Sequence, residues 1–567
     1  MSWFNEADMI VAHAKIYTVD TDIDRIKAGD YSFPVIEDGG VAVKDGKIIF
    51  VGKAEDVSGF AGEHTKLIDA SGKILVPGFC DSHMHSQETG LGMSGIDLLG
   101  VHSKEEMLAA IQDYAKTLAP GKWILGNNCW NEQLWDIPEL PTCHDLDKAA
   151  PDNPCYVIRY CHHLAAANTA AMRAAGISRD TPDPTGGFID HFDNGEPNGL
   201  FYEQAAFCMV EKPITSIYAG LAELNTDPEK TGEAGFVASI ETVGKLLSAY
   251  GITSTIDTNV SNAQLRAYER ALKEGKLKYR ANLMYFLNIV DGDAKRHCAK
   301  VVDDLPIVTG FGNDMVKFNG LKVLYDGMLD IFTAAMRAPY PQRPDSLGMT
   351  VWTPEDLELM AVTATTNGWQ FGVHTIGDRA ADEALAAFEA ADAVSPIKDK
   401  RFFLIHDFFP HEDQLATMRR MNVGAALQPS LLARISFDSK QWCEDMPLGH
   451  GAGMFFSAGV ICGGSSDSPV SDPSVIEGIY YTVSGKDISG RIMLNEESRI
   501  SPVQALVMWT KNSAYLLNSD DSLGSIAEGY LADMVIIDRD FLSGGIEDIP
   551  KAKIDTTILG GQIVYQA

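Results

Sequence analysis

The sequence predicts an α/β fold in which a (β/α)8 TIM barrel is combined with a small composite β-sandwich domain and an inserted subdomain. Two observations predict it: eight short apolar runs alternate with helix-like segments, and β-type runs gather at both ends of the chain. With 567 residues, the chain is too long for one ordinary core. We expect residues 1–75 plus 495–567 to form the β-sandwich domain, 76–494 the barrel, and about 90–240 the insertion.

The two ends of the chain carry the β-type runs. Near the N-terminus stand "DMIVAHAKIYTV" and "GGVAVKDGKIIFVG", the second of which turns at Asp45-Gly46, a typical two-residue hairpin signal. Near the C-terminus stand "DMVIIDRD" and "TTILGGQIVYQA". Isolated hairpins are only marginally stable, so we expect the two ends to share one β domain.

The eight predicted barrel strands follow one another along the middle of the chain. They are "ILVPGFCDSHMH", "GITSTID", "YRANLMYFL", "LKVLYDG", "QFGVHTIG", "RFFLIHDFF", "GAALQPS" and "VICGGSSDS". Segments between them, such as "TPEDLELMAVTATTNG" and "ADEALAAFEAAD", have helical periodicity and begin near Thr or Asp. More than 150 residues separate the first strand from the second, which places the insertion there.

Side chains that can bind metal stand at the C-terminal ends of these strands, where barrel enzymes place their active sites. They are His83, His85, Lys322, His374, His406 and Asp467. Residues i and i+2 of a strand point to the same side, so His83 and His85 can reach one ion with Zn–N bonds of about 2.1 Å. Met84 should point away between them. The joint placement predicts a metal site.

Composition limits the partners. The 78 acidic against 46 basic residues give a net charge of −32, which disfavours nucleic acid. No apolar run reaches the ~18 residues that span a bilayer, and no secretion signal is evident. The nine cysteines form no C-x-x-C pair, which suits reduced thiols, and we expect a cytoplasmic protein with a small-molecule substrate. The oligomeric state stays open, a homodimer being one option.

The chain resembles the amidohydrolase superfamily. Its entrance motif, Pro-Gly-Phe-x-Asp-x-His-x-His, stands here as "PGFCDSHMH". "HHLAAANTAAM", "PTGGFIDHFDNGEPNGLFYEQA", "GWQFGVHTIGDRAADEAL" and "GGSSDSPV" resemble the subgroup called amidohydrolase family 3 (YtcJ-like), which includes N-substituted formamide deformylase. The resemblance covers almost the whole chain.

This resemblance implies one or two divalent metal ions, with Zn2+ the expected metal. His83, His85 and Asp467 would hold the more buried ion, and His374 and His406 the outer one. Lys322 would bridge the two ions only when N6-carboxylated, because an ammonium has no lone pair to donate. An unmodified Lys322 would leave a one-metal site.

The expected reaction is attack of a metal-bound hydroxide on a carbonyl, with Asp467 as ligand and general base. His163 is the candidate hydrogen-bond donor to the substrate carbonyl or oxyanion. Glu203 and Asp326 could orient ligands or substrate, or form structural ion pairs with about equal odds. Trp130 could line the substrate pocket; an aromatic residue there is as often plain core.

Two departures from the subgroup bear on the substrate. Ile405 replaces the usual Glu before His406, and "DGSLGSRTA" becomes "DGMLDIFTA", which brings in Met328, Ile331 and Phe332. A polar loop has become apolar, so we expect a substrate with a hydrophobic or aromatic part that Phe332 contacts, and no carboxylate bound at this loop.

The leading hypothesis is a metal-dependent hydrolase of a non-peptide C–N bond in an N-acyl or N-formyl amine, carbamate or related amide. A heterocycle deaminase and a lactone or ester hydrolase are alternatives on the same site. Deaminases of this superfamily often lack the bridging lysine, so Lys322 disfavours them. A metal-binding regulatory protein without activity is a remote alternative.

Overall fold

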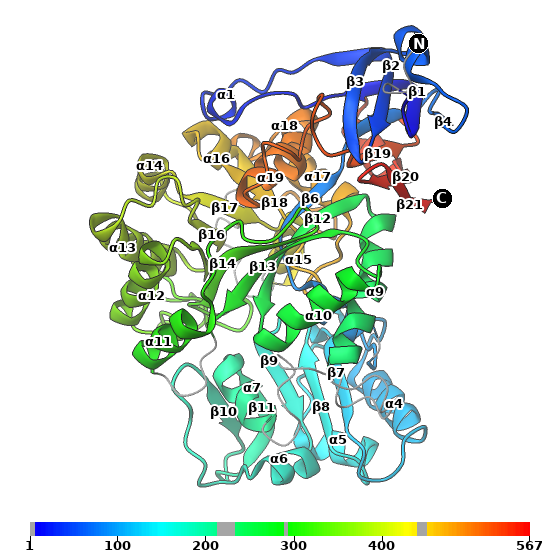
Figure 1. Ribbon diagram of the computed structural model, residues 1–567. Coiled ribbons are helices and arrows are strands. Elements are labelled where there is room, and N and C mark those ends of the chain that lie inside the picture. Colours follow the sequence, from blue (N-terminus) through cyan, green and yellow to red (C-terminus); the bar gives the residue numbers. More distant parts are fainter. Residues whose placement is uncertain (1–5, 94, 212–232, 288–292, 439–450) are drawn as a thin grey trace.

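The computed structural model describes residues 6–93, 95–211, 233–287, 293–438 and 451–567, and its centre is a barrel of parallel strands (Figure 1). The strands form one sheet in the order β18-β17-β16-β15-β14-β13-β12-β6. They are β6 (Phe79–Met84), β12 (Ile252–Val260), β13 (Arg280–Phe286), β14 (Val316–Leu324), β15 (Gln370–Thr375), β16 (Phe403–His406), β17 (Gly424–Leu427) and β18 (Cys462–Gly464). The predicted α/β barrel is confirmed, and each strand overlaps a predicted run.

The first and last strands meet through hydrogen bonds. Ser82 Oγ donates to the Gly464 carbonyl at 3.0 Å, and the Asp467 N–H donates to the His83 carbonyl at 2.9 Å. The His85 N–H donates to the Ser468 carbonyl at 2.8 Å. The first two predicted ligands are thereby placed beside the last one, although more than 380 residues separate them in sequence.

The first predicted barrel strand divides in two. Residues Ile74–Pro77 form β5 of the terminal sheet, and the barrel strand β6 starts only at Phe79. Pro77 has no N–H to continue a ladder. At Gly78 a Cβ would lie 2.3 Å from Thr253 Oγ1, so the chain changes sheets at a position where only glycine fits.

Helices surround the barrel. They are α3 (Ser86–Gly92), α9 (Glu233–Ala249), α10 (Asn262–Lys273), α11 (Ala294–Asp304), α12 (Pro354–Thr366), α13 (Asp378–Val394), α14 (Glu412–Met421), α15 (Pro429–Asp438), α16 (Ala452–Ala458), α17 (Val475–Ser484), α18 (Pro502–Val507) and α19 (Ser513–Leu516). The predicted start of α12 is confirmed by a capping box between Thr353 and Asp356. No helix of the described residues is long and apolar enough to cross a membrane.

Strands from both termini build a second sheet, in the order β21-β20-β19-β5-β1-β2-β3 with β4 beside β1. They are β1 (Met9–Tyr17), β2 (Val35–Lys44), β3 (Lys47–Lys53), β4 (Lys66–Asp69), β5, β19 (Met534–Ile537), β20 (Ile554–Leu559) and β21 (Gln562–Gln566). Asp45 and Gly46 have φ of 51° and 75°, the left-handed values that the predicted β2–β3 turn requires. The short helix α2 (Ala54–Val57) packs on this sheet, whereas α1 (Ile23–Lys27) packs against the barrel, where Lys27 Nζ donates to Asn422 Oδ1 at 2.6 Å.

A third sheet lies at the opposite end of the barrel from the terminal sheet (Figure 1). Its order is β10-β11-β9-β8-β7. Its elements are β7 (Ile124–Trp130), β8 (Cys155–Arg159), β9 (Leu164–Ala167), β10 (Phe188–His191), β11 (Pro197–Tyr202), and the helices α4 (Lys104–Ala115), α5 (Cys143–Ala149), α6 (Thr169–Ala175) and α7 (Glu203–Glu211). All of them belong to the segment between β6 and β12, so this inserted segment forms a sheet separate from the barrel.

Candidate metal centre

A cavity of about 400 Å³ lies where the barrel strands end. All six side chains predicted to bind metal line this cavity: His83, His85, Lys322, His374, His406 and Asp467. His163 from the inserted segment lines it too. The fold therefore gathers these residues from five barrel strand ends and from the insertion.

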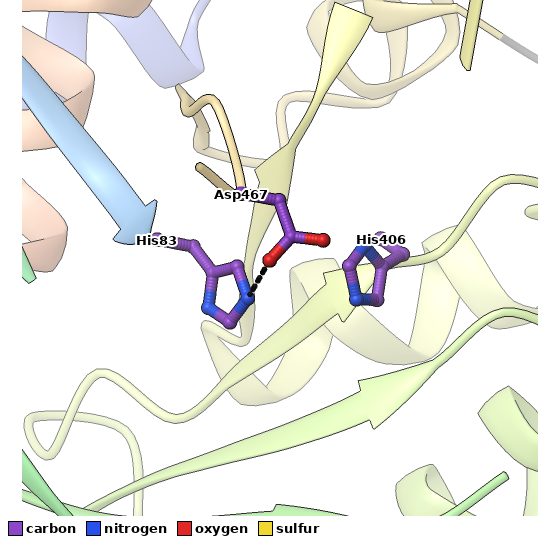
Figure 2. Close-up of side chains that lie close together, drawn as sticks. All are labelled: His83, His406 and Asp467. Carbon is purple, nitrogen blue, oxygen red and sulfur yellow. Dashed lines mark ion pairs between the residues drawn. The ribbon is translucent and has the colours of Figure 1, made fainter. Parts of the chain in front are cut away.

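The first group of candidate ligands surrounds the carboxylate of Asp467. His83 Nε2 lies 2.9 Å and His85 Nε2 3.1 Å from the same oxygen, Asp467 Oδ1. Figure 2 shows the Asp467 carboxylate between His83 and His406, and each of these three offers one ligand atom within 4.8 Å of the others. Met84 is fully buried in the hydrophobic core, so the strand turns its apolar side chain away from the cavity.

Asp467 occupies an unusual backbone conformation. Its φ is 57°, and His406 and Glu203 have φ of 78° and 66°. Residues other than glycine adopt this left-handed region at an energetic cost, and such residues cluster at functional sites where the surrounding structure holds them.

The second group is a facing pair of histidines. His374 Nδ1 and His406 Nε2 are 2.9 Å apart. His374 Nε2–H donates to the Gly327 carbonyl at 3.4 Å, and His406 Nδ1–H donates to Gln428 Oε1 at 2.7 Å. The Gln428 amide nitrogen donates to Ala426 O and Ser465 Oγ, both at 2.9 Å, which fixes its oxygen as the acceptor. Both nitrogens that face each other are therefore lone-pair acceptors in the neutral rings.

This donor set fits a divalent metal. Two lone pairs facing at 2.9 Å repel each other, whereas a cation bonded to both at about 2.0–2.1 Å accounts for the spacing. Although His83 Nε2 lies 2.9 Å from Asp467 Oδ1, neither of these buried atoms, nor His83 Nδ1, has a partner of hydrogen-bond geometry among the described residues. Imidazole and carboxylate are ligands that zinc accepts, so the residues match such an ion.

Burial keeps these histidines neutral, as metal ligation requires. It lowers the pKa of His83 and His374 well below the usual value, and that of His406 to about 4. Burial acts on the carboxyl of Asp467 in the opposite sense and raises its pKa. The interactions with His83 and His85 outweigh burial, so the net pKa of Asp467 is well below its usual value. Asp467 is thus ionised at neutral pH.

Lys322 is 2% exposed and projects from the end of β14 into the same cavity. Its Nζ donates to Asn259 Oδ1 at 3.4 Å, and Asn259 Nδ2 donates to Glu88 Oε1 at 3.4 Å. Burial lowers the pKa of the amine to about 8, against the raising effect of Asp467, Glu88 and Asp257. No carboxylate lies within salt-bridge distance of this amine among the described residues.

His163 is paired with Glu203. Its Nδ1–H donates to Glu203 Oε2 at 2.7 Å, and its ring lies 5.3 Å from that of His374. Burial lowers the pKa of His163, but Glu203 raises it more, so the net pKa is raised. A Cβ at Gly327 would lie 2.3 Å from Glu203 Oε1, so this glycine allows the dyad to lie against the loop after β14.

The Asp326 carboxylate accepts hydrogen bonds from backbone N–H groups and does not line the cavity. Its carboxylate accepts the N–H groups of Ala335, Ile376 and Gly377 at 2.8–2.9 Å. It thereby ties the loop after β14 to the residues that follow His374. This arrangement agrees with the expected orienting role, which stays a prediction.

Two residues expected to contact substrate are placed elsewhere. The Trp130 ring is fully buried in the core of the inserted segment, and its Nε1 donates to the Val157 carbonyl at 3.3 Å. Phe332 packs against Tyr340, with Arg343 over its ring. Neither lines the metal cavity in the described part of the chain, because apolar packing in the same core takes up both rings. Met328 and Ile331 are buried in that core as well.

The structure contains a buried ion network beside the cavity that the sequence did not predict. Arg159, at the end of β8, is fully buried; its Nε and Nη2 donate to Glu132 at 2.7 and 2.8 Å, and its Nη1 donates to Asp330. Asp330 lies in the loop that looked apolar in sequence, and here it joins the insertion to the barrel. An arginine that ends the apolar run "CYVIR" and the acid within "DGMLDIFTA" were the available signals.

Replacing Arg159 by methionine should lower the free energy of unfolding by about 3–5 kcal/mol, because two buried carboxylates lose their cation. Thermal and urea denaturation measure the change. Arg266→Met, which removes an exposed arginine on α10, is the matched control and should have little effect. Equal midpoints for the two variants would contradict the structural role of the network.

Comparisons with known proteins bear on the family and the fold. A family model described as the amidohydrolase family matches residues 66–565. The Bacillus subtilis (strain 168) protein YtcJ, named as an amidohydrolase, is 30% identical over 95% of this chain and 98% of its own length. N-substituted formamide deformylase of Arthrobacter pascens is 24% identical over 99% of this chain and 98% of its own length. A crystal structure of a metal-dependent hydrolase from Pyrococcus horikoshii OT3 matches with a TM-score of 0.70 at 22% identity, over 95% of this chain and 99% of that one.

Proposed function

The chain belongs to the amidohydrolase family, and we propose that this metal-dependent hydrolase cleaves the non-peptide C–N bond of a small N-acyl or N-formyl amine, carbamate or related amide. The observation that carries the proposal is the facing pair of His374 and His406 beside the Asp467 group in one cavity. Phe286, Leu324 and Val470 line the same cavity, which suits a substrate with a hydrophobic or aromatic part.

The residues divide into two groups of metal ligands. His83, His85 and Asp467 would hold one ion, and His374 and His406 a second, with zinc the expected metal and carboxylated Lys322 between them. Such an ion, when bound, lowers the pKa of a coordinated water and polarises a carbonyl. Asp467 is ionised and can take a proton from the nucleophilic water and deliver it to the leaving nitrogen.

His163 can stabilise the oxyanion only when it is protonated. The Glu203 carboxylate accepts the proton on Nδ1, so a neutral His163 would present a lone pair rather than an N–H at Nε2. In the imidazolium form, Nε2–H can donate to the developing negative charge on the carbonyl oxygen. Glu203 favours this form because it raises the pKa of His163.

Replacing Glu203 by glutamine should therefore shift the alkaline limb of the kcat/KM profile to lower pH. Loss of a charge-assisted hydrogen bond lowers the pKa of His163, so the donor form disappears earlier as pH rises. A pH–rate profile of wild type and E203Q measures the shift. His163→Gln should remove this limb altogether and reduce kcat by about 10²- to 10³-fold. An alkaline limb that is the same in all three proteins would contradict the donor role.

The substrate class is tested by a screen of N-acyl amines, carbamates, lactones and aminated heterocycles with the metal-loaded protein. We expect turnover of amides or carbamates, and higher kcat/KM when they carry a hydrophobic part. Turnover of aminated heterocycles alone would show a deaminase, and turnover of lactones alone would show an ester hydrolase. Either result would overturn the proposed substrate class.

A further inference from the structure

A second cavity adjoins the metal cavity. It is open to solvent, spans about 1200 Å³ with that solvent space included, and shares Val470 with the metal cavity. The chain also connects the two: Tyr160 lines the second cavity, and the next three residues, 161–163, line the first. Ser468 and Pro469, which follow Asp467, line the second cavity as well. We call this space the vestibule, because it lies next to the metal cavity.

Arg434 of α15 brings a positive charge to the vestibule wall. Its side chain is partly buried, and no carboxylate of the described residues lies within 4.0 Å of its guanidinium. Its guanidinium lies over the ring of Tyr160, whose centroid is 5.4 Å away, and it also interacts electrostatically with Glu477 and Tyr481 of α17. Other partly buried arginines, such as Arg379 and Arg401, have an acidic partner in Glu383 and Asp520.

The contacts around Tyr160 fix the place of this guanidinium. The Tyr160 ring also lies under the Arg159 guanidinium, at 4.7 Å, and its hydroxyl donates to Asp330 Oδ2 at 3.0 Å. Glu132 and Asp330 are engaged by Arg159, so neither neutralises Arg434. The buried ion network therefore supports an aromatic platform on which an unpaired arginine rests.

The acids on the vestibule wall are held by other partners. Asp97 Oδ1 accepts the Leu99 N–H at 2.9 Å. Asp472 accepts the Ser474 N–H at 2.9 Å and the Tyr250 hydroxyl at 3.2 Å. Both carboxylates thus bond to groups other than Arg434. Burial raises the net pKa of Glu477 of α17, and Arg434 is near enough to oppose this shift, but among the described residues Glu477 forms no salt bridge with the guanidinium.

We infer that Arg434 binds a carboxylate of the substrate, so that the preferred amide is an N-acyl ω-amino acid whose carboxylate stands several bonds from the scissile amide. This inference rests on the proposed amide hydrolysis. A guanidinium matches a carboxylate with two parallel hydrogen bonds, and partial burial strengthens them. In a chain of net charge −32, an unpaired arginine at this wall provides a local attraction for an anion that the rest of the surface would repel. The apolar loop after Lys322 would not bind the carboxylate, because its side chains pack in the core.

The test compares substrates that differ only in charge. N-formyl-6-aminohexanoate is paired with N-formyl-6-aminohexanamide, within a series from N-formylglycine to N-formyl-8-aminooctanoate. Wild type should show a lower KM for the carboxylate than for the amide at one chain length. Arg434→Met should raise KM for the carboxylate by about 10- to 100-fold and leave the neutral partner unchanged. The KM of Arg434→Lys for the carboxylate should lie between those of wild type and Arg434→Met, because lysine keeps the charge but loses the two parallel hydrogen bonds. Arg266→Met removes an exposed arginine as the matched control, and it should change the KM of neither substrate.

Two results would overturn the inference. One is an equal effect of Arg434→Met on the charged and neutral substrates, and the other is no effect on either. If wild type hydrolyses no amide, the proposed function fails, and calorimetric binding of 6-acetamidohexanoate to the metal-loaded wild type and R434M decides the matter separately. Binding that weakens about tenfold or more in R434M would support the carboxylate site, and equal or absent binding would reject it.

Discussion

Replacing Asp467 by asparagine should lower kcat by about 10³- to 10⁴-fold while the protein stays folded. The substitution removes the negative charge to which His83 and His85 point and, in the proposed mechanism, the base that accepts the proton of water. Asparagine is suited to the left-handed φ of 57° at this position, so the backbone has no new strain. The backbone N–H that donates to His83 is also retained.

Steady-state kinetics with an amide found in the screen, together with circular dichroism and metal analysis, measure these effects. Asp538→Asn, a change near the end of β19 in the terminal sheet, is the matched control and should keep full activity. Residual activity of D467N within tenfold of wild type would refute the role of Asp467 as base.

Replacing Lys322 by methionine should lower kcat by about 10²- to 10³-fold. If carboxylated Lys322 joins two ions, its loss removes an oxygen ligand from each, and the second ion becomes weakly held. Methionine fills a similar volume and removes only the polar end, so the barrel should remain intact. The expected metal content then falls from two ions per chain towards one.

Metal analysis and a carbon NMR spectrum after incubation with 13C-labelled bicarbonate test this prediction. Wild type should show a carbamate signal that K322M lacks. Lys317→Met, near the beginning of the same strand β14, should retain both the signal and the activity. Unchanged metal content and activity in K322M would show that this lysine does not bridge ions.

The barrel could be predicted from sequence because its signals are local. Each strand is a short apolar run followed by a helical segment, and the metal-binding side chains stand where these runs end. The barrel topology then brings together residues as distant as His83 and Asp467, so the sequence pattern alone located all six candidate metal ligands on the cavity wall.

The contacts that orient these residues could not be predicted, because they depend on distant pairings without a local pattern. The side chain of Gln428 is oriented by hydrogen bonds with His406 and Ser465. The carboxylate of Asp330 pairs with Arg159, 171 positions away in sequence. For Trp130 the sequence left a pocket residue and a core residue equally open, and the fold of the inserted sheet buries its ring. An isolated sequence segment shows which side chains are available and leaves their partners open.

The metal content of the purified protein, measured by inductively coupled plasma mass spectrometry alongside a His83→Asn/His85→Asn variant, tests the central claim most directly. The facing lone pairs of His374 and His406 and the histidines around Asp467 predict one or two divalent ions per wild-type chain, with zinc expected, and a clear loss in the variant. A wild-type chain that holds no divalent metal and takes up none from added zinc would contradict the account.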